Sequence, residues 1–132
     1  MDKVIKELAD YRLSKAKEDL ETSEINFEAK KYSQSLNRSY YSIFHCARAL
    51  LAYEKFDSKK HTGIISFFNK NFIKEKKIEE EYFLIIKDAE MFRMQSDYQD
   101  FFIVSREDAQ GQLENAKKFM GKISEYISET YA

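Results

Sequence analysis

The sequence predicts an all-α protein, an antiparallel up-and-down bundle of four long helices plus one short helix. Its 132 residues include no proline and only 3 glycines, while 34% are charged. That composition is typical of long helices, because strands and tight turns need more turn residues. Apolar residues also recur three and four positions apart through long segments, which is the spacing of one helix face. The length suits one core, so we expect a single domain over residues 1–132.

Two segments in the first half of the chain show this spacing. We expect the first helix over residues 2–28 and the second over residues 32–54. The apolar stripe of the first comprises Ile5, Ala9, Leu13, Ala16, Leu20 and Phe27. The apolar stripe of the second comprises Leu36, Tyr40, Ile43, Phe44, Ala47, Leu50 and Leu51. Because each helix has one apolar face, the helices must pack on each other.

Three more helices are expected in the second half. A polar connection leads to a short helix over residues 63–73, and a long helix follows over residues 77–96. Ser105 is followed by acidic residues, which predicts an N-cap and a last helix from there to residue 129. The inward residues of these two long helices are Ile78, Tyr82, Ile85, Ala89 and Phe92, then Ala109, Leu113, Ala116, Met120, Ile123 and Ile127.

Arg38 and His45 are the main candidates for a functional site. They lie seven positions apart in the second predicted helix, so they face the same side, two turns apart. Their neighbours around the helix are polar or small, namely Tyr41, Ser42, Arg48, Ala49 and Ala52. This sector lies opposite the apolar stripe, so we expect the core to leave it free. The small side chains of Ala49 and Ala52 would let a partner helix approach closely.

Three segments together resemble the HEPN domain, a small helical fold of prokaryotes and higher eukaryotes. The first reads NRSYYSIFHCARALL over residues 37–51. The second reads KHTGI over residues 60–64 and continues with Phe67, Phe68 and Phe72, and the third reads RMQSDY over residues 93–98. In this order they look closest to the stand-alone prokaryotic HEPN proteins, which are often encoded beside a minimal nucleotidyltransferase. The resemblance extends over nearly the whole chain.

The resemblance implies a homodimer in which the two motif helices form one composite cleft. The family signature is an arginine and a histidine separated by four to six residues, and Arg38 and His45 have six between them. Active members are metal-independent endoribonucleases and toxins, with the nucleotidyltransferase as antitoxin. Here Ser39 follows the arginine, where active families often carry Asn, Asp or His. The alternative is therefore a non-catalytic HEPN module that binds nucleotide or acts as a scaffold for the nucleotidyltransferase.

The chemistry of RNA cleavage agrees with these residue types. Without a metal ion, the 2′-OH attacks its own phosphodiester, and only RNA carries that group. Histidine suits the proton transfers because its ordinary pKa lies near neutrality. Arginine suits the phosphorane charge through its planar set of donors. One chain offers only His45 on this face, so acid–base chemistry with two histidines would need the dimer.

We assign Arg38 and His45 as candidate catalytic residues. The candidate substrate-binding residues are Tyr41, Ser42, Arg48, Arg93, Asp97 and Tyr98. Structural roles compete with several of these assignments. His45 could instead hydrogen-bond a neighbouring tyrosine, and Arg93 and Asp97 have the spacing of an ion pair within one helix. Tyr98 is either a core-edge residue or, by the resemblance, a tyrosine that the nucleotidyltransferase modifies, and His61 is predicted as a loop or capping residue.

Composition excludes several other classes. A net charge of -1 gives no global electrostatic case for nucleic-acid binding, so any such binding needs a local patch. Two histidines 16 positions apart and one cysteine match no zinc spacing, and no other cofactor motif is present. Cys46 cannot form an internal disulfide and lies about 100° from His45 around a helix, which argues against a Cys–His pair. No apolar run approaches the length of a membrane span, so we expect a soluble cytoplasmic protein.

Overall fold

The computed structural model describes residues 2–131, and this part of the chain is helical without a strand. Its α-helices are α1 (Lys3–Glu28), α2 (Tyr32–Ala52), α3 (His61–Phe68), α4 (Glu80–Tyr98) and α5 (Arg106–Thr130). A π-helical turn, η1 (Asn69–Ile73), continues α3. The predicted class and element order are confirmed, and the observed bounds differ from the predicted ones by a few residues.

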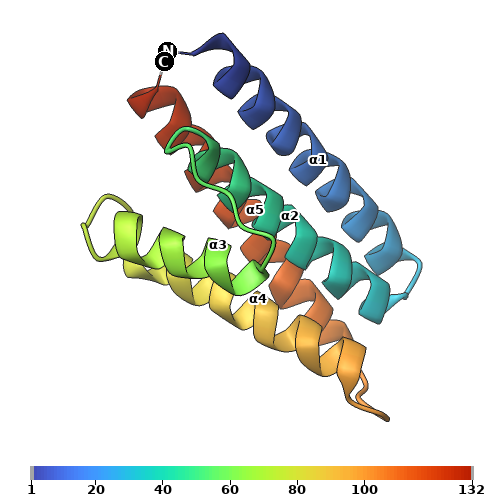
Figure 1. Cartoon of the computed structure of the whole chain (residues 1–132). Helices are drawn as coiled ribbons and strands as arrows, with labels where there is room; N and C mark the ends of the chain where they lie inside the picture. The colour runs from blue at the N-terminus through green and yellow to red at the C-terminus, as the bar shows by residue number, and fades with distance from the viewer. Residues whose placement is uncertain (1, 132) are drawn as a thin grey trace.

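The four long helices alternate in direction, as predicted. In Figure 1, α1 and α4 run one way, α2 and α5 run the other way, and the start of α1 lies near the end of α5. The short α3 lies along α4, after a connection that returns from the end of α2. None of the helices within the described residues has an apolar stretch long enough to span a membrane.

Helix α2 is the central helix of the bundle. It contacts all four other α-helices, and 13 of its 21 residues are buried, against 4 of 26 in α1. The largest fully buried side chains of the whole protein include Tyr40, Phe68, Phe72 and Phe119. Phe119 lay outside the apolar stripe predicted for the last helix, whereas the predicted Met120 is only half-buried. Because α2 packs against helices on more than one side, it buries more than one face.

Small residues and hydroxyl groups line the contact between α1 and α2. The Ser23 hydroxyl lies 2.7 Å from that of Ser39 and donates to the Ser35 carbonyl over 2.8 Å. The Ser42 hydroxyl donates to the Ala16 carbonyl over 2.8 Å. These short side chains let the two backbones approach closely, and every buried hydroxyl of this contact has a partner, as burial of polar groups requires.

The expectation that the core leaves the Arg38 side of α2 free was wrong for its small residues. Ser42 and Ala49 are fully buried and Ala52 is nearly so within the single chain, and Ser42 contacts Ala16 of α1. The apolar periodicity of α2 identifies its strongest stripe but cannot show that alanine and serine pack just as closely against a neighbouring helix. Ala49 and Ala52 are therefore buried within the single chain and do not offer a surface to a partner helix.

Local signals set the helix boundaries. The Ser105 hydroxyl accepts from the Asp108 backbone N–H, and the Asp108 carboxylate accepts in return from the Ser105 N–H, which confirms the predicted N-cap as a capping box. At α3, a Cβ on Gly63 would overlap the Ser58 side-chain oxygen. Any larger residue at position 63 would thus need the Ser58 side chain to move.

Candidate functional site

Arg38 and His45 converge on a carboxylate that comes from another helix. The Arg38 guanidinium Nη1 lies 3.0 Å from Oδ1 of Asp19, and His45 Nε2 lies 3.6 Å from Oδ2 of the same residue. Asp19 belongs to α1, so the contact between α1 and α2 assembles this group. The side chains of His45 and Asp19 are 16% and 14% exposed, whereas that of Arg38 is 36% exposed. Solvent therefore reaches the site chiefly along Arg38.

Burial and surrounding positive charge keep His45 neutral. Burial is the main cause that lowers the pKa of His45 to about 4, and nearby cations lower it further. These cations are Arg48, Lys15, Arg38 and Arg12. Burial also raises the pKa of the Asp19 carboxyl, and the charge of Arg38 opposes that shift. At neutral pH the imidazole is thus uncharged and able to accept a proton.

The imidazole of His45 is only loosely held. Its Nδ1 is buried and has no hydrogen-bond partner within the described residues. The 3.6 Å from its Nε2 to Asp19 exceeds the usual hydrogen-bond length. The Tyr41 ring lies 6.1 Å from the His45 ring, centroid to centroid, and the Arg38 guanidinium carbon lies 4.9 Å above the same Tyr41 ring. Tyr41 therefore packs between the two candidate catalytic residues as a wall of the site.

Arg48 is committed to a separate ion pair. Its Nη2 lies 2.7 Å from Oδ2 of Asp57, in the connection between α2 and α3. Arg12 of α1 reaches the same carboxylate at 3.3 Å and donates to the Arg48 carbonyl over 3.1 Å. The two arginines tie the connection to α1 and α2, and they add positive charge near His45. Ser42, the other predicted binding residue on this side, is buried and donates to Ala16.

The remaining predicted residues lie on α4. Arg93 and Asp97 form the predicted ion pair within one helix, with Nη1 and Oδ2 3.3 Å apart. The Arg93 guanidinium carbon also lies 4.9 Å above the Tyr40 ring of α2. Tyr98 is 74% exposed, so its placement at the core edge was wrong. It lines a groove of about 470 Å³ together with Met91 and Met94.

Residues of α1, α2 and α4 line a cavity of about 360 Å³ beside Arg38. Its lining residues are Asn26, Ser33, Gln34, Asn37, Arg38 and Asp97. The Ser33 and Ser96 hydroxyls lie 3.1 Å apart and join the two helices nearby. Arg38 thus borders both the Asp19 contact and this polar cavity, which Asp97 also lines.

His61 is a second histidine with different surroundings. It is the first residue of α3, and the N-cap residue is Lys60, so the prediction of a loop or capping residue was wrong. Its Nδ1 lies 2.7 Å from the Tyr40 hydroxyl, and its ring centroid lies 4.2 Å from that of Phe44. The Tyr41 ring is 6.0 Å away, centroid to centroid, so both histidines border Tyr41.

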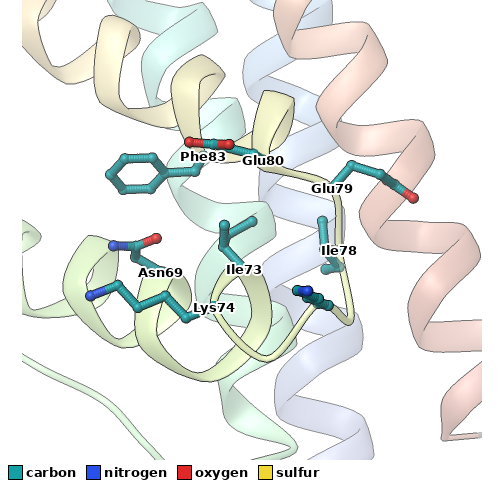
Figure 2. A pocket seen from close by; sticks show the side chains of 8 residues that line it. Asn69, Ile73, Lys74, Ile78, Glu79, Glu80 and Phe83 are labelled. Carbon is teal, nitrogen blue, oxygen red and sulfur yellow. The ribbon is translucent and has the colours of Figure 1, made fainter.

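Another cavity lies elsewhere in the fold, at the start of α4. It has a volume of about 550 Å³, and Figure 2 shows Asn69, Lys74, Glu80 and Phe83 around it. None of the residues predicted for the site lines it. Among the described residues, no three His, Cys, Asp or Glu side chains gather as metal ligands. Cys46 is buried, and burial raises the pKa of its thiol.

Asp19 is the site residue that sequence reasoning missed. Its position in the first predicted helix gave no sign of function, because charged residues surround it on the exposed side of the stripe. One signal was available. Asp19 follows the inward Ala16 by three positions and precedes the inward Leu20, so it lies at the edge of the packed face. An acidic residue at such an edge can reach the neighbouring helix.

The geometry defines a class of protein, a helical bundle with an arginine and a histidine directed at one anion. A model of the HEPN domain family matches residues 9–126, which is most of the chain. The chain therefore belongs to the HEPN domain family, as its three motif segments predicted.

Several proteins are similar to it over most of their lengths. A protein named "Putative toxin MJ0605" from Methanocaldococcus jannaschii is 34% identical over 129 residues, which cover 98% of this chain and 96% of the relative. A second protein from that organism, named "Putative toxin MJ0142", is 33% identical over 87% of this chain and 78% of its own length. A UPF0332 protein from Gloeobacter violaceus is 30% identical over 89% of this chain and 94% of the relative. This HEPN family thus includes relatives that are named as toxins.

Proposed function

We propose that the chain is the toxin of a toxin–antitoxin pair and that it cuts RNA without a metal ion. The observation that carries the proposal is the convergence of Arg38 and His45 on one carboxylate. An anion bound between these side chains can accept hydrogen bonds from the Arg38 guanidinium. It would also lie beside the His45 imidazole, which can transfer a proton. A phosphodiester is such an anion. The relatives named as toxins support the biological role.

In the proposed reaction, neutral His45 accepts the proton of a ribose 2′-OH. The 2′-oxygen attacks the adjacent phosphorus, and the bond from phosphorus to the 5′-oxygen breaks. The products are a 2′,3′-cyclic phosphate and a 5′-hydroxyl, which receives its proton from a second group. Arg38 binds the non-bridging oxygens and stabilises the charge that develops on them. The anionic phosphate also favours the protonated imidazole, which raises the pKa of His45 as the reaction proceeds.

We propose a homodimer in which the second copy supplies the proton for the leaving group. Tyr98, Phe101 and Ile103 are 74%, 99% and 85% exposed. They follow Asp97, which lines the same cavity as Arg38. Exposed apolar clusters of this kind mark surfaces that bind other proteins. A two-fold contact here would place the two Arg38 cavities near each other, and closed two-fold dimers are the commonest assemblies.

The proposed antitoxin is a minimal nucleotidyltransferase that acts with this chain in the cytoplasm. The resemblance to stand-alone prokaryotic HEPN proteins supports this partner, and the names of the relatives support a paired system. The exposed hydroxyl of Tyr98 would be accessible to such an enzyme. Because Tyr98 belongs to the proposed dimer surface, a modification there would also change the assembly of the two copies.

The decisive test uses purified protein and end-labelled RNA in excess chelator. Wild type should cut the RNA and leave cyclic phosphate ends, and His45→Ala should not. Replacing the 2′-OH at the cut position with hydrogen should abolish cutting, because the nucleophile is gone. Undiminished cleavage by His45→Ala would refute the mechanism.

A non-catalytic nucleotide-binding or scaffold module is the second candidate. The polar cavity of about 360 Å³ beside Arg38 favours it, since that volume suits a small ligand. Binding of ATP that Arg38→Ala abolishes, without cleavage of RNA by wild type, would identify this function instead.

A further inference from the structure

Asp19 lies where the proposed mechanism needs the phosphate. Its two carboxylate oxygens face Arg38 Nη1 at 3.0 Å and His45 Nε2 at 3.6 Å. One carboxylate oxygen pairs with Arg38 and the other faces His45, and a phosphodiester likewise presents two anionic oxygens. Asp19 therefore already makes the contacts that a substrate phosphate would make, and both anions cannot occupy the same place.

We infer that Asp19 masks the Arg38–His45 pair, so that its carboxylate must be displaced from the phosphate position before RNA can bind. The inference rests on the proposed function, which identifies the displacing anion as a phosphodiester. Asp19 would thus regulate the site, because access of RNA to Arg38 and His45 depends on how readily the Asp19 side chain moves aside.

The charges around the site favour such an exchange of anions. Helix α1 contributes Arg12, Lys15 and Asp19, and α2 contributes Arg38 and Arg48. Arg38 and Lys15 favour the charged form of the Asp19 carboxyl, whereas the neighbouring Glu18 opposes it. Arg12 and Arg48 act on His45 and are themselves paired with the exposed Asp57. The carboxylate contact to His45 is longer than a hydrogen bond, and burial raises the pKa of Asp19. A phosphate entering from the open side of Arg38 would therefore replace a partly satisfied anion.

Displacement of Asp19 does not require α1 to leave the bundle. The contacts that hold α1 on α2 lie on its buried side, at Ala9, Ala16 and Ser23. Asp19 lies at the edge of this packed face, with its side chain still partly exposed. A change of its side-chain rotamer would open the site while those contacts persist.

An alternative role for Asp19 is to orient the imidazole, as carboxylates do in catalytic triads. The two roles predict opposite results for Asp19→Asn. A masking carboxylate weakens the binding of anions, so its removal should tighten RNA binding. An orienting carboxylate should leave binding unchanged or weaker, and its removal should lower only the rate.

The test measures binding of a fluorescein-labelled 2′-O-methyl RNA, which lacks the nucleophile and cannot be cut. Its affinity for Asp19→Asn should rise about five- to tenfold over wild type, the size expected from removing one nearby charge. Asp10→Asn is the matched control, since Asp10 is an exposed residue of α1 paired with Lys6. It removes the same charge and should change the affinity by less than about twofold.

Two further variants make the result specific to the site. Adding Arg38→Gln to Asp19→Asn should remove the gain, because the phosphate then lacks its clamp. If Asp19→Asn does not unfold cooperatively by circular dichroism, Asp19→Ser replaces it with a smaller side chain that is also uncharged. Equal or weaker binding by a folded Asp19 variant overturns the mask. Tighter binding without cleavage of ordinary RNA by any variant keeps the mask and refutes the nuclease.

Discussion

The two histidines of this protein show how one residue type acquires two different roles. His61 lies on the α3 and α4 side of α2, where its Nδ1 is 2.7 Å from the Tyr40 hydroxyl and its ring packs on Phe44. His45 lies on the α1 side, where its Nδ1 has no partner in the described chain and Asp19 is 3.6 Å from its Nε2. Burial lowers the pKa of both.

The difference lies in how well each imidazole is satisfied. Burial raises the pKa of the Tyr40 hydroxyl, which stays protonated and can donate to His61. His61 is thereby fixed as a packing group. His45 has a ring nitrogen without a partner among the described residues and several cations close by, so we expect an incoming anion to raise its pKa. Function is therefore expected on the α1 side of α2, and structural support on the other side.

The largest expected effect is a difference in RNA cleavage between variants of His45 and variants of His61. His45→Ala should lower RNA cleavage by about 10²–10⁴-fold, the range for a positioned acid or base. His61→Ala should lower it by less than about tenfold, because that ring holds Tyr40 and does not face Arg38. Single-turnover cleavage in chelator measures both. An equal loss in the two variants would make His61 the second proton-transfer group within one chain.

The next effect concerns the arginine of the same side. Arg38→Lys keeps the charge but loses the planar pair of donors, so cleavage should fall about 10–100-fold. Arg106→Lys is the control, because Arg106 is exposed at the start of α5 and packs on Phe27. The same assay compares the two variants. Full activity of Arg38→Lys would show that only a point charge is needed at that position.

The pH dependence of stability tests the protonation of His45. Its pKa of about 4 in the folded protein lies below its ordinary value. The unfolded chain therefore binds the proton more readily, and the stability contributed by neutral His45 is complete above about pH 6.5 and is lost as the pH falls toward 4. We expect a loss of about 1–2 kcal/mol between about pH 7.5 and pH 5 in urea unfolding. His45→Gln should reduce this loss, and an unchanged pH dependence would contradict it.

The smallest effect concerns His61. Tyr40→Phe removes the hydroxyl that lies 2.7 Å from His61 Nδ1 and should cost about 1 kcal/mol of folding free energy. RNA cleavage should stay within about twofold of wild type, because the change affects only the structural side. Thermal unfolding and the cleavage assay provide the two measurements. Loss of cleavage at unchanged stability would show that residues on the α3 side of α2 also take part in cleavage.

Several parts of the fold could be predicted from local chemistry. Apolar spacing identified all five α-helices, and a serine three positions before an aspartate located the start of α5. The Arg93–Asp97 pair was predictable because both residues lie on one helix, where geometry is local. The relation between Arg38 and His45 was predictable for the same reason. The family followed from motif segments whose order and spacing are visible in the chain itself.

Tertiary structure decided what faces those local elements. The packing of α1 over α2 buried Ser42 and Ala49, and it brought Asp19 of α1 to Arg38 and His45. Periodicity describes one helix at a time and ranks its faces by apolar content. It cannot show which polar edge of a neighbouring helix will arrive beside a given side chain, because that depends on the depth and rotation at which two helices pack. The relative position of Arg38 and His45 is therefore predictable from the sequence of α2. The position of the Asp19 carboxylate between them depends on how α1 packs against α2.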